Sequence, residues 1–171
     1  MDNLVDQVRD LYYLDKEAKK FLGGIPFSDN IKQKLDNYKF LKEGLPNRKR
    51  IAIGTVAMKN DKVIGYHSFT ILRKANPTQY EKNNIKLKNK LNYVQIKEII
   101  VHPMFRNQGV AMQMMEEGLT IAKEITIPYV GDMIQKNKSM ANLFSKLNFQ
   151  VDFNWKTPNN TLMYRVISHI H

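Results

Sequence analysis

The chain contains no cysteine. Catalytic thiols, disulfide bonds and thiolate metal sites are therefore excluded, while a reducing compartment is compatible with the sequence. Runs of about 18 or more apolar residues are also missing, and residues 1–4 lack the basic start and apolar stretch of a signal peptide. We therefore expect a cytoplasmic protein that does not cross a membrane.

Acidic residues are scarce. Sixteen Asp and Glu stand against 27 Lys and Arg, which gives a formal net charge of +11 over 171 residues. The excess concentrates in two segments, with seven Lys/Arg against two acids at 32–50 and six against one at 73–90. A field of this sign attracts polyanions such as cofactor phosphates, nucleic acid or acidic proteins. A lysine-rich surface without a specific partner explains the composition equally well, so both interpretations stay open.

Metal-binding patterns are also weak. His67 and His102 have no carboxylate partner at ligand spacing, and His169 and His171 stand in the C-terminal tail. We expect no metal site.

The order of hydrophobic periodicities predicts a mixed α/β fold in a single domain. Helical spacing predicts one helix in the first twenty residues, stopped at Gly23, and a second that Ser28 caps and Gly44 ends. Apolar runs predict strands at 50–58, 63–72, 93–101, 127–130, 149–153 and 161–166, with helices following Gly109 and at 138–146.

The segment at 101–111 carries the clearest chemical signal, because it joins an apolar strand to an amphipathic helix. Backbone N–H groups at a helix N-terminus lack intrahelical partners and can donate to phosphate oxygens. Small residues at Gly109 and Ala111 allow an anion to approach the main chain, and Arg106 adds a positive charge. These features predict an anion-binding loop.

This loop resembles the acyl-CoA-binding motif of the GNAT N-acetyltransferase superfamily, whose pattern is Arg or Gln, two residues, Gly, one residue, then Gly or Ala. Arg106, Gly109 and Ala111 match it, and the preceding 101–103 fits the Val, any residue, Pro that ends the family's strand. A later helix motif is matched in part, with departures at 140 and 148. The matching positions are Asn137, Leu143, Phe144, Lys146 and Phe149.

The resemblance implies a GNAT-like central mixed sheet, in which two parallel strands splay apart and acetyl-CoA enters the gap. It makes 1–46 a helical segment on the substrate side and 50–166 the cofactor-binding core of one domain. The expected cofactor contacts are the backbone of Ile99, Ile100 and Val101 for the pantetheine arm, the loop of Arg106, Asn107, Gln108, Gly109, Val110 and Ala111 for the pyrophosphate, and Asn137 with Phe144 beside the thiol end.

The resemblance also implies direct attack of a primary amine on the thioester, which requires a base for the amine and an acid for the departing thiolate. Relatives place a Tyr acid where this chain has Phe144, so the acid comes from Tyr66, Tyr129 or Tyr164, or the thiolate departs unassisted, or catalysis is lost. Glu98 is the candidate base, against a structural ion pair with a neighbouring Lys or Arg. Strict alternation puts it on the face opposite Gln95, and a β-bulge would reverse this.

Three functions follow from these observations. The first is an acetyl-CoA-dependent N-acetyltransferase that acts on an unidentified primary amine. The second is a catalytically silent acyl-CoA-binding or interaction module. In the third, the basic segments hold RNA, tRNA or DNA as acceptor or partner. The sequence leaves the acceptor and the oligomeric state open.

Overall fold

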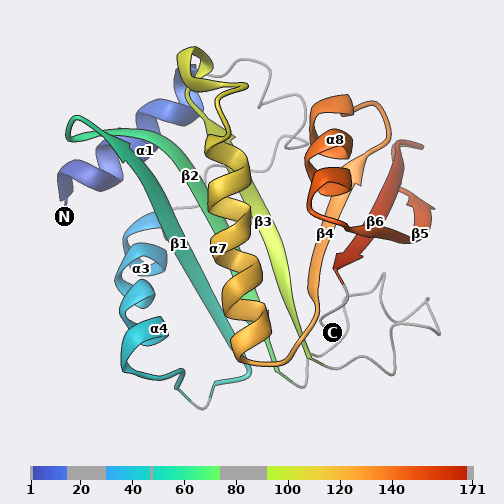
Figure 1. Cartoon of the computed structure of the whole chain (residues 1–171), viewed down its shortest axis with the longest axis horizontal. Coiled ribbons are helices and arrows are strands. Elements are labelled where there is room, and N and C mark those ends of the chain that lie inside the picture. The colour runs from blue at the N-terminus through green and yellow to red at the C-terminus, as the bar shows by residue number, and fades with distance from the viewer. Residues whose placement is uncertain (1, 15–29, 47, 74–91, 169–171) are drawn as a thin grey trace.

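The computed structural model describes residues 2–14, 30–46, 48–73 and 92–168. A six-stranded sheet forms its centre, in the order β1-β2-β3-β4-β6-β5. Helices flank the sheet, and α7 and α8 lie over the face turned toward the viewer in Figure 1. The predicted mixed α/β fold is confirmed.

The described N-terminal residues are mainly helical. Helix α1 covers Asp2–Leu14, and α3 (Ile31–Asp36) is followed by a 3-10 turn, η1 (Asn37–Lys39), and by α4 (Phe40–Glu43). The predicted second helix therefore ends at Gly44 as expected, but a 3-10 turn interrupts it. At the break, the side-chain amide of Asn37 donates to the backbone oxygen of Ala52, which ties this turn to the neighbouring strand. Ser28 and Gly23 lie outside the described residues.

The next two strands form the predicted antiparallel hairpin, with β1 at Arg50–Lys59 and β2 at Lys62–Leu72. Strand β3 (Tyr93–Val101) pairs antiparallel with β2. The short turn η2 (Pro103–Phe105) then leads to α7 (Val110–Glu124). These elements follow their predicted positions, because each has a long and unambiguous apolar pattern.

Strand β4 differs from its prediction, since it covers Tyr129–Ile134 and not 127–130. Pro128 has no N–H to donate, and Gly131 and Asp132 interrupt the apolar run that a sequence pattern needs. Pairing with β6 nevertheless continues to Ile134. Helix α8 occupies Lys138–Lys146 as predicted, and β5 (Gln150–Lys156) with β6 (Leu162–Ser168) closes the sheet.

Two hydrophobic clusters cover the opposite faces of the sheet. On one face, α7 and α8 contribute residues such as Met115, Ala122 and Phe144 to a core that includes Ile96 of β3. On the other face, α1 packs Val8 and Leu11 against β2, β3 and Ile31 of α3. Within the described ranges, no helix is long and apolar enough to cross a membrane.

A β-bulge in β3 decides which side chains share a face. Ser68 of β2 is opposite Glu98, but Phe69 is opposite Ile96, so Lys97 is an extra residue in the ladder. Ile96 points into the core beneath α7, whereas Glu98 contacts Lys34 on the α3 side. The bulge therefore places Glu98 on the same face as Gln95, and the placement expected from strict alternation is wrong.

Candidate functional site

The parallel strands β3 and β4 separate soon after they meet. Their described ladder consists of Val94 with Tyr129 and Gln95 with Val130. Both strands then continue, β3 to Val101 and β4 to Ile134, without pairing to each other. We call the point of separation, after Gln95 and Val130, the fork. Beyond it the edge of β3 that faces β4 has no strand partner among the described residues.

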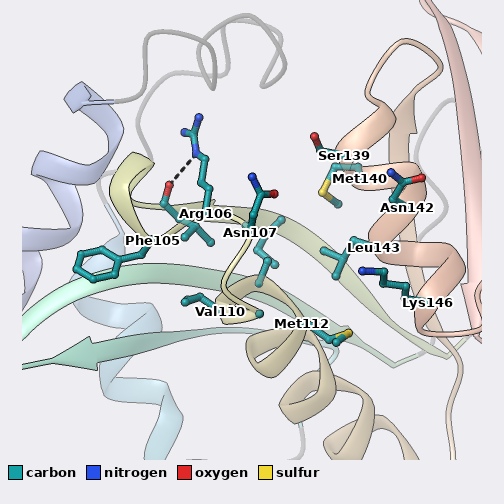
Figure 2. Close-up of a pocket in the computed structure, with 14 residues that line it drawn as sticks. Phe105, Arg106, Asn107, Val110, Met112, Ser139, Met140, Asn142, Leu143 and Lys146 are labelled. Carbon is teal, nitrogen blue, oxygen red and sulfur yellow. Dashed lines mark hydrogen bonds between the residues drawn. The ribbon is translucent and has the colours of Figure 1, made fainter.

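A pocket opens on the α7 and α8 side of this gap (Figure 2). Its volume is about 340 Å³, which lies in the lower range of ligand sites in proteins. We call it the α7–α8 pocket. Its lining comes from β3, from the loop before α7, from the first turn of α7 and from α8. The lining residues are Ile99, Val101, Phe105, Arg106, Asn107, Gly109, Val110, Ala111, Met112, Ser139, Met140, Asn142, Leu143 and Lys146.

The loop before α7 presents the start of the helix to this pocket. Gly109 is the N-cap, with φ of 84° in the left-handed region, and it offers no capping side chain. The first intrahelical bond runs from the N–H of Gln113 to the oxygen of Gly109. The N–H groups of 110–112 therefore have no partner within the helix, and the first turn of α7 carries no acidic residue. This is the arrangement that favours a bound anion.

Side-chain contacts hold the loop in shape. The ring of His102 accepts a hydrogen bond from the N–H of Met104, and the amide of Gln108 donates to the oxygen of Met104 at 2.9 Å. Arg106 donates through Nε to the oxygen of Val101, as the dashed line in Figure 2 shows. Arg106 and Lys146 bring two cationic side chains to the pocket lining.

Most of the predicted cofactor residues meet in the α7–α8 pocket. Ile99, Val101, Arg106 and Asn107 line it together with 109–111. Ile100 is buried on the α1 side of the sheet opposite Tyr66 of β2, and it does not line the pocket. Gln108 is exposed and does not line the pocket.

The two residues predicted beside the thiol end, Asn137 and Phe144, do not line the pocket. Asn137 is the N-cap of α8, where its side-chain oxygen accepts from the N–H of Met140. Phe144 is 2% exposed and packs on Phe149, outside the pocket lining. Its ring tip reaches the fork, since a Cβ added to Gly131 would lie 2.6 Å from the Cζ of Phe144.

Glu98 is buried between α3 and the sheet. It accepts hydrogen bonds from the Ser68 hydroxyl at 2.7 Å and from the Lys34 ammonium at 3.1 Å, the latter being an ion pair. Burial, with the nearby charge of Glu98 as a smaller cause, raises the pKa of Tyr12 well above its usual range. Glu98 does not line the α7–α8 pocket. The ion pair that was the alternative role for Glu98 is present. The catalytic role of Glu98 stays a prediction.

Three tyrosines were candidate acids. Tyr66 and Tyr129 are fully buried, and burial raises the pKa of each hydroxyl above its usual range. The Tyr129 hydroxyl lies 2.8 Å from Nε2 of His67 in the core. Tyr164 is partly exposed on β6. Its direct neighbour in the sequence, Arg165, points to the opposite face, where it binds Asp132.

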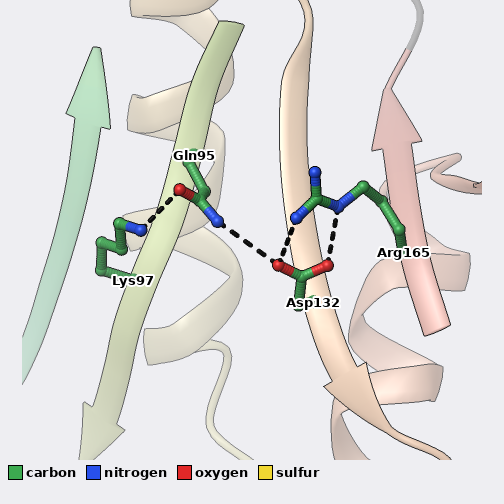
Figure 3. Close-up of polar contacts among 4 residues, drawn as sticks. All are labelled: Gln95, Lys97, Asp132 and Arg165. Carbon is green, nitrogen blue, oxygen red and sulfur yellow. Dashed lines mark hydrogen bonds and ion pairs between the residues drawn. The ribbon is translucent and has the colours of Figure 1, made fainter. Parts of the chain in front are cut away.

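Sequence reasoning missed a polar network at the fork (Figure 3). Arg165 donates to both carboxylate oxygens of Asp132 at 2.7 Å, and Gln95 donates to the same carboxylate at 3.3 Å. Lys97 donates to the side-chain oxygen of Gln95. Asp132 is a single charged residue in an otherwise apolar strand, and one residue forms no spacing pattern from which this network could be predicted. The α8 side of the pocket was also missed as lining, because only tertiary packing brings Ser139, Met140, Asn142, Leu143 and Lys146 to β3.

Within the described ranges, no cluster of three His, Asp or Glu residues could hold a metal ion. A second cavity, of about 290 Å³, lies beside β1, the outermost strand of the described sheet, and is lined by Leu35, Tyr38, Thr55, Glu117 and neighbouring residues.

The chain matches the model of the acetyltransferase (GNAT) family over residues 7–149. It therefore belongs to this family, and the resemblance seen in the sequence is confirmed. No curated protein matches the chain.

Solved structures show the same fold at low sequence identity. The protein smu.2055 from Streptococcus mutans UA159 aligns with a TM-score of 0.65 and 12% identity over 98% of this chain and 96% of that one. A GNAT family acetyltransferase from Elizabethkingia anophelis with acetyl-CoA bound gives 0.56 and 16%, over 85% and 84%. An N-acetyltransferase from Staphylococcus aureus Mu50 gives 0.52 and 17%, over 70% and 68%.

Proposed function

We propose that this protein is an acetyl-CoA-dependent N-acetyltransferase, which transfers an acetyl group to a primary amine by direct attack on the thioester. The observation that carries the proposal is the divergence of β3 from β4 into a pocket that ends at the uncapped N-terminus of α7. Membership of the acetyltransferase family supports the same reaction.

The residues of the pocket fit the chemistry of coenzyme A. The N–H groups of 110–112, together with Arg106 and Lys146, offer donors and positive charge to the pyrophosphate. The edge of β3 that faces away from β2 has no strand partner at 99–101 and offers backbone groups to the pantetheine amides, although the Val101 oxygen also accepts from Arg106. Leu143 supplies an apolar wall. The acyl end of such a ligand would point toward the fork.

The amine must lose a proton before or during attack, and Glu98 is the acidic residue of β3 on the face opposite the pocket. Its side chain is paired with Lys34 and accepts a hydrogen bond from Ser68. For the thiolate, Tyr164 is the one partly exposed hydroxyl among the three candidates.

Calorimetric titration with acetyl-CoA tests the cofactor site. We expect micromolar binding to the unchanged protein and at least a tenfold weaker affinity for Gly109→Glu, which places a negative charge at the anion site and strains a positive φ. Gly44→Glu is the matched control, because Gly44 also has a positive φ, of 100°, open space around it and a position outside the pocket. No binding to the unchanged protein would overturn the proposal, as would equal losses in both variants.

A silent acyl-CoA-binding module is the second candidate, and Phe144 favours it. This side chain reaches the fork but has no hydroxyl to protonate a thiolate. Thiol release from acetyl-CoA, measured with a panel of primary amines and anilines, separates the two candidates. Tight binding without turnover of any amine would favour the module.

The basic surface supports nucleic acid as an acceptor or partner. Six of the seven Lys and Arg residues at 32–50 are exposed, and the seventh, Lys34, pairs with Glu98. The second basic segment lies mostly outside the described residues. RNA or DNA binding that falls steeply with salt, and that weakens in Lys39→Gln, Lys42→Gln and Lys49→Gln combined, would support this role. Binding that is absent or insensitive to salt would refute it.

A further inference from the structure

The fork is closed on both faces of the sheet. On the α8 face, Gly131, Ile96 and Phe144 meet so closely that a Cβ on Gly131 would lie 2.6 Å from Phe144 and 3.1 Å from Ile96. On the opposite face, the Gln95 amide donates to Asp132 across the opening (Figure 3). We call these two sets of contacts the floor. An extended ligand that enters between β3 and β4 from the pocket would therefore stop at the fork.

Charged partners hold the polar half of this floor in place. Arg165, which is 3% exposed, binds Asp132 through two short hydrogen bonds, and such a bidentate pair fixes the carboxylate in one orientation. Lys97 donates to the oxygen of the Gln95 amide while the nitrogen of the same amide donates to Asp132. Both ends of the amide are therefore hydrogen-bonded. Its oxygen faces the positive Lys97 and its nitrogen faces the negative Asp132, so these two charges determine its orientation.

The gap is short enough for one ligand to span. Ile96 and Val101 lie opposite Phe69 and Gly65, which are four residue steps apart on β2 because Lys97 is the extra residue of the bulge, and at about 3.3 Å per step the stretch measures roughly 13 Å. An acetylated pantetheine arm has roughly fourteen bonds between the pyrophosphate and the acetyl methyl, which at about 1.2 Å per bond gives roughly 17 Å when extended, enough to cover this stretch and the approach from the start of α7. An arm whose pyrophosphate lies beside the start of α7 would therefore bring the acetyl methyl to the floor.

We propose that Gln95, held by Lys97 and Asp132, is a specificity-determining residue that limits the acyl group to a short chain. This inference rests on the proposed function, since it assumes that acyl-CoA occupies the gap. Each pair of additional methylenes would lengthen the arm by about 2.5 Å, and the closed floor gives it no room. Longer acyl chains must then displace Gln95 or lift the arm from the strand edge, and either change weakens binding.

Calorimetric titration of free CoA, acetyl-CoA and hexanoyl-CoA tests the floor without an acceptor and without turnover. For the unchanged protein we expect hexanoyl-CoA to bind at least about tenfold more weakly than acetyl-CoA, because a filled pocket rejects added methylenes by factors of this size. Gln95→Ala removes the polar half of the floor and leaves the half made by Phe144 and Ile96 in place, so an added acyl chain can extend toward the face opposite α8 and hexanoyl-CoA should come within about threefold of acetyl-CoA. Gln95→Asn, shorter by one methylene, should fall between the two.

Two controls keep the result specific to the fork. Gln113→Ala makes the same change at an exposed position of α7 outside the pocket lining and should keep the tenfold preference. Free CoA has no acyl group, so its affinity should change less than about twofold in every variant, which also reports that the variants are folded. If Gln95→Ala no longer binds free CoA, the affinities of Gln95→Asn for hexanoyl-CoA and acetyl-CoA test the floor in its place.

The outcomes separate two failures. If the unchanged protein binds none of the three ligands, the proposed function fails and this inference falls with it. If it binds all three equally, or if both Gln95 variants keep the full preference for acetyl-CoA, the cofactor site stands and the floor is refuted.

Discussion

The buried His67 should make the stability of this protein fall in mild acid. Its side chain is fully buried beneath α7, its Nε2 lies 2.8 Å from the Tyr129 hydroxyl, and burial lowers its pKa to about 3. In the unfolded chain a histidine titrates near 6.5. The folded pKa is thus depressed, so the contribution to stability is fully present above pH 6.5 and is lost as the pH falls toward 3.

The size of this loss follows from the two pKa values. Between pH 7 and pH 5 the unfolded chain takes up about 0.7 proton at this position while the folded protein takes up almost none. Integration over this interval gives about 2 kcal/mol, at about 1.4 kcal/mol per pH unit below the unfolded pKa. His67→Gln removes the titrating group, so the stability difference between the unchanged protein and this variant should shrink by about 2 kcal/mol from pH 7 to pH 5.

Urea unfolding followed by circular dichroism at both pH values measures this difference. Tyr129→Phe is the control, because it removes the hydrogen-bond partner and leaves His67 buried. It should cost about 1 kcal/mol at either pH and leave the pH dependence as in the unchanged protein. If the unfolding free energies of the unchanged protein and His67→Gln differ by the same amount at pH 7 and pH 5, the reasoning is refuted.

Two other substitutions probe the close packing of α7 and the buried acid. Gly118→Ala would place a Cβ 2.2 Å from the Tyr129 hydroxyl, and we expect a loss of about 1 to 3 kcal/mol in urea unfolding; an unchanged midpoint would contradict this contact. Glu98→Gln leaves Lys34 without its carboxylate partner, so a purely structural role predicts a lower Tm with kcat retained. A catalytic role predicts instead that kcat falls by about 10² or more, even at temperatures where the variant is fully folded.

The sequence predicted the fold well wherever a pattern was local. Strand β3 and helix α8 follow their predicted bounds, since each has an apolar run or spacing that matches one period. The predictions of the second helix and of β4 were less accurate. Asn37 forms a hydrogen bond with β1, and β4 pairs with β6, and these contacts override the local pattern. Such contacts join residues that are distant along the chain.

The same distinction applies to the site. Arg106, Gly109 and Ala111 could be read from the sequence, because a strand, a loop and a helix N-terminus follow one another directly and create the anion site within a few residues. Phe144 could be placed on α8, but not its burial against Phe149. The side of the sheet on which Glu98 lies depends on a bulge that periodicity does not reveal.

By itself, the sequence determined the family, the order of the elements and the loop at the start of α7, because these depend on spacing along a short stretch of chain. Only the tertiary structure decided how β3 and β4 diverge, which residues of α8 complete the pocket, and how Gln95 meets Asp132 and Arg165 at the fork. The physical reason is that strand separation and side-chain ties depend on contacts between segments far apart in sequence, whose geometry no local pattern encodes.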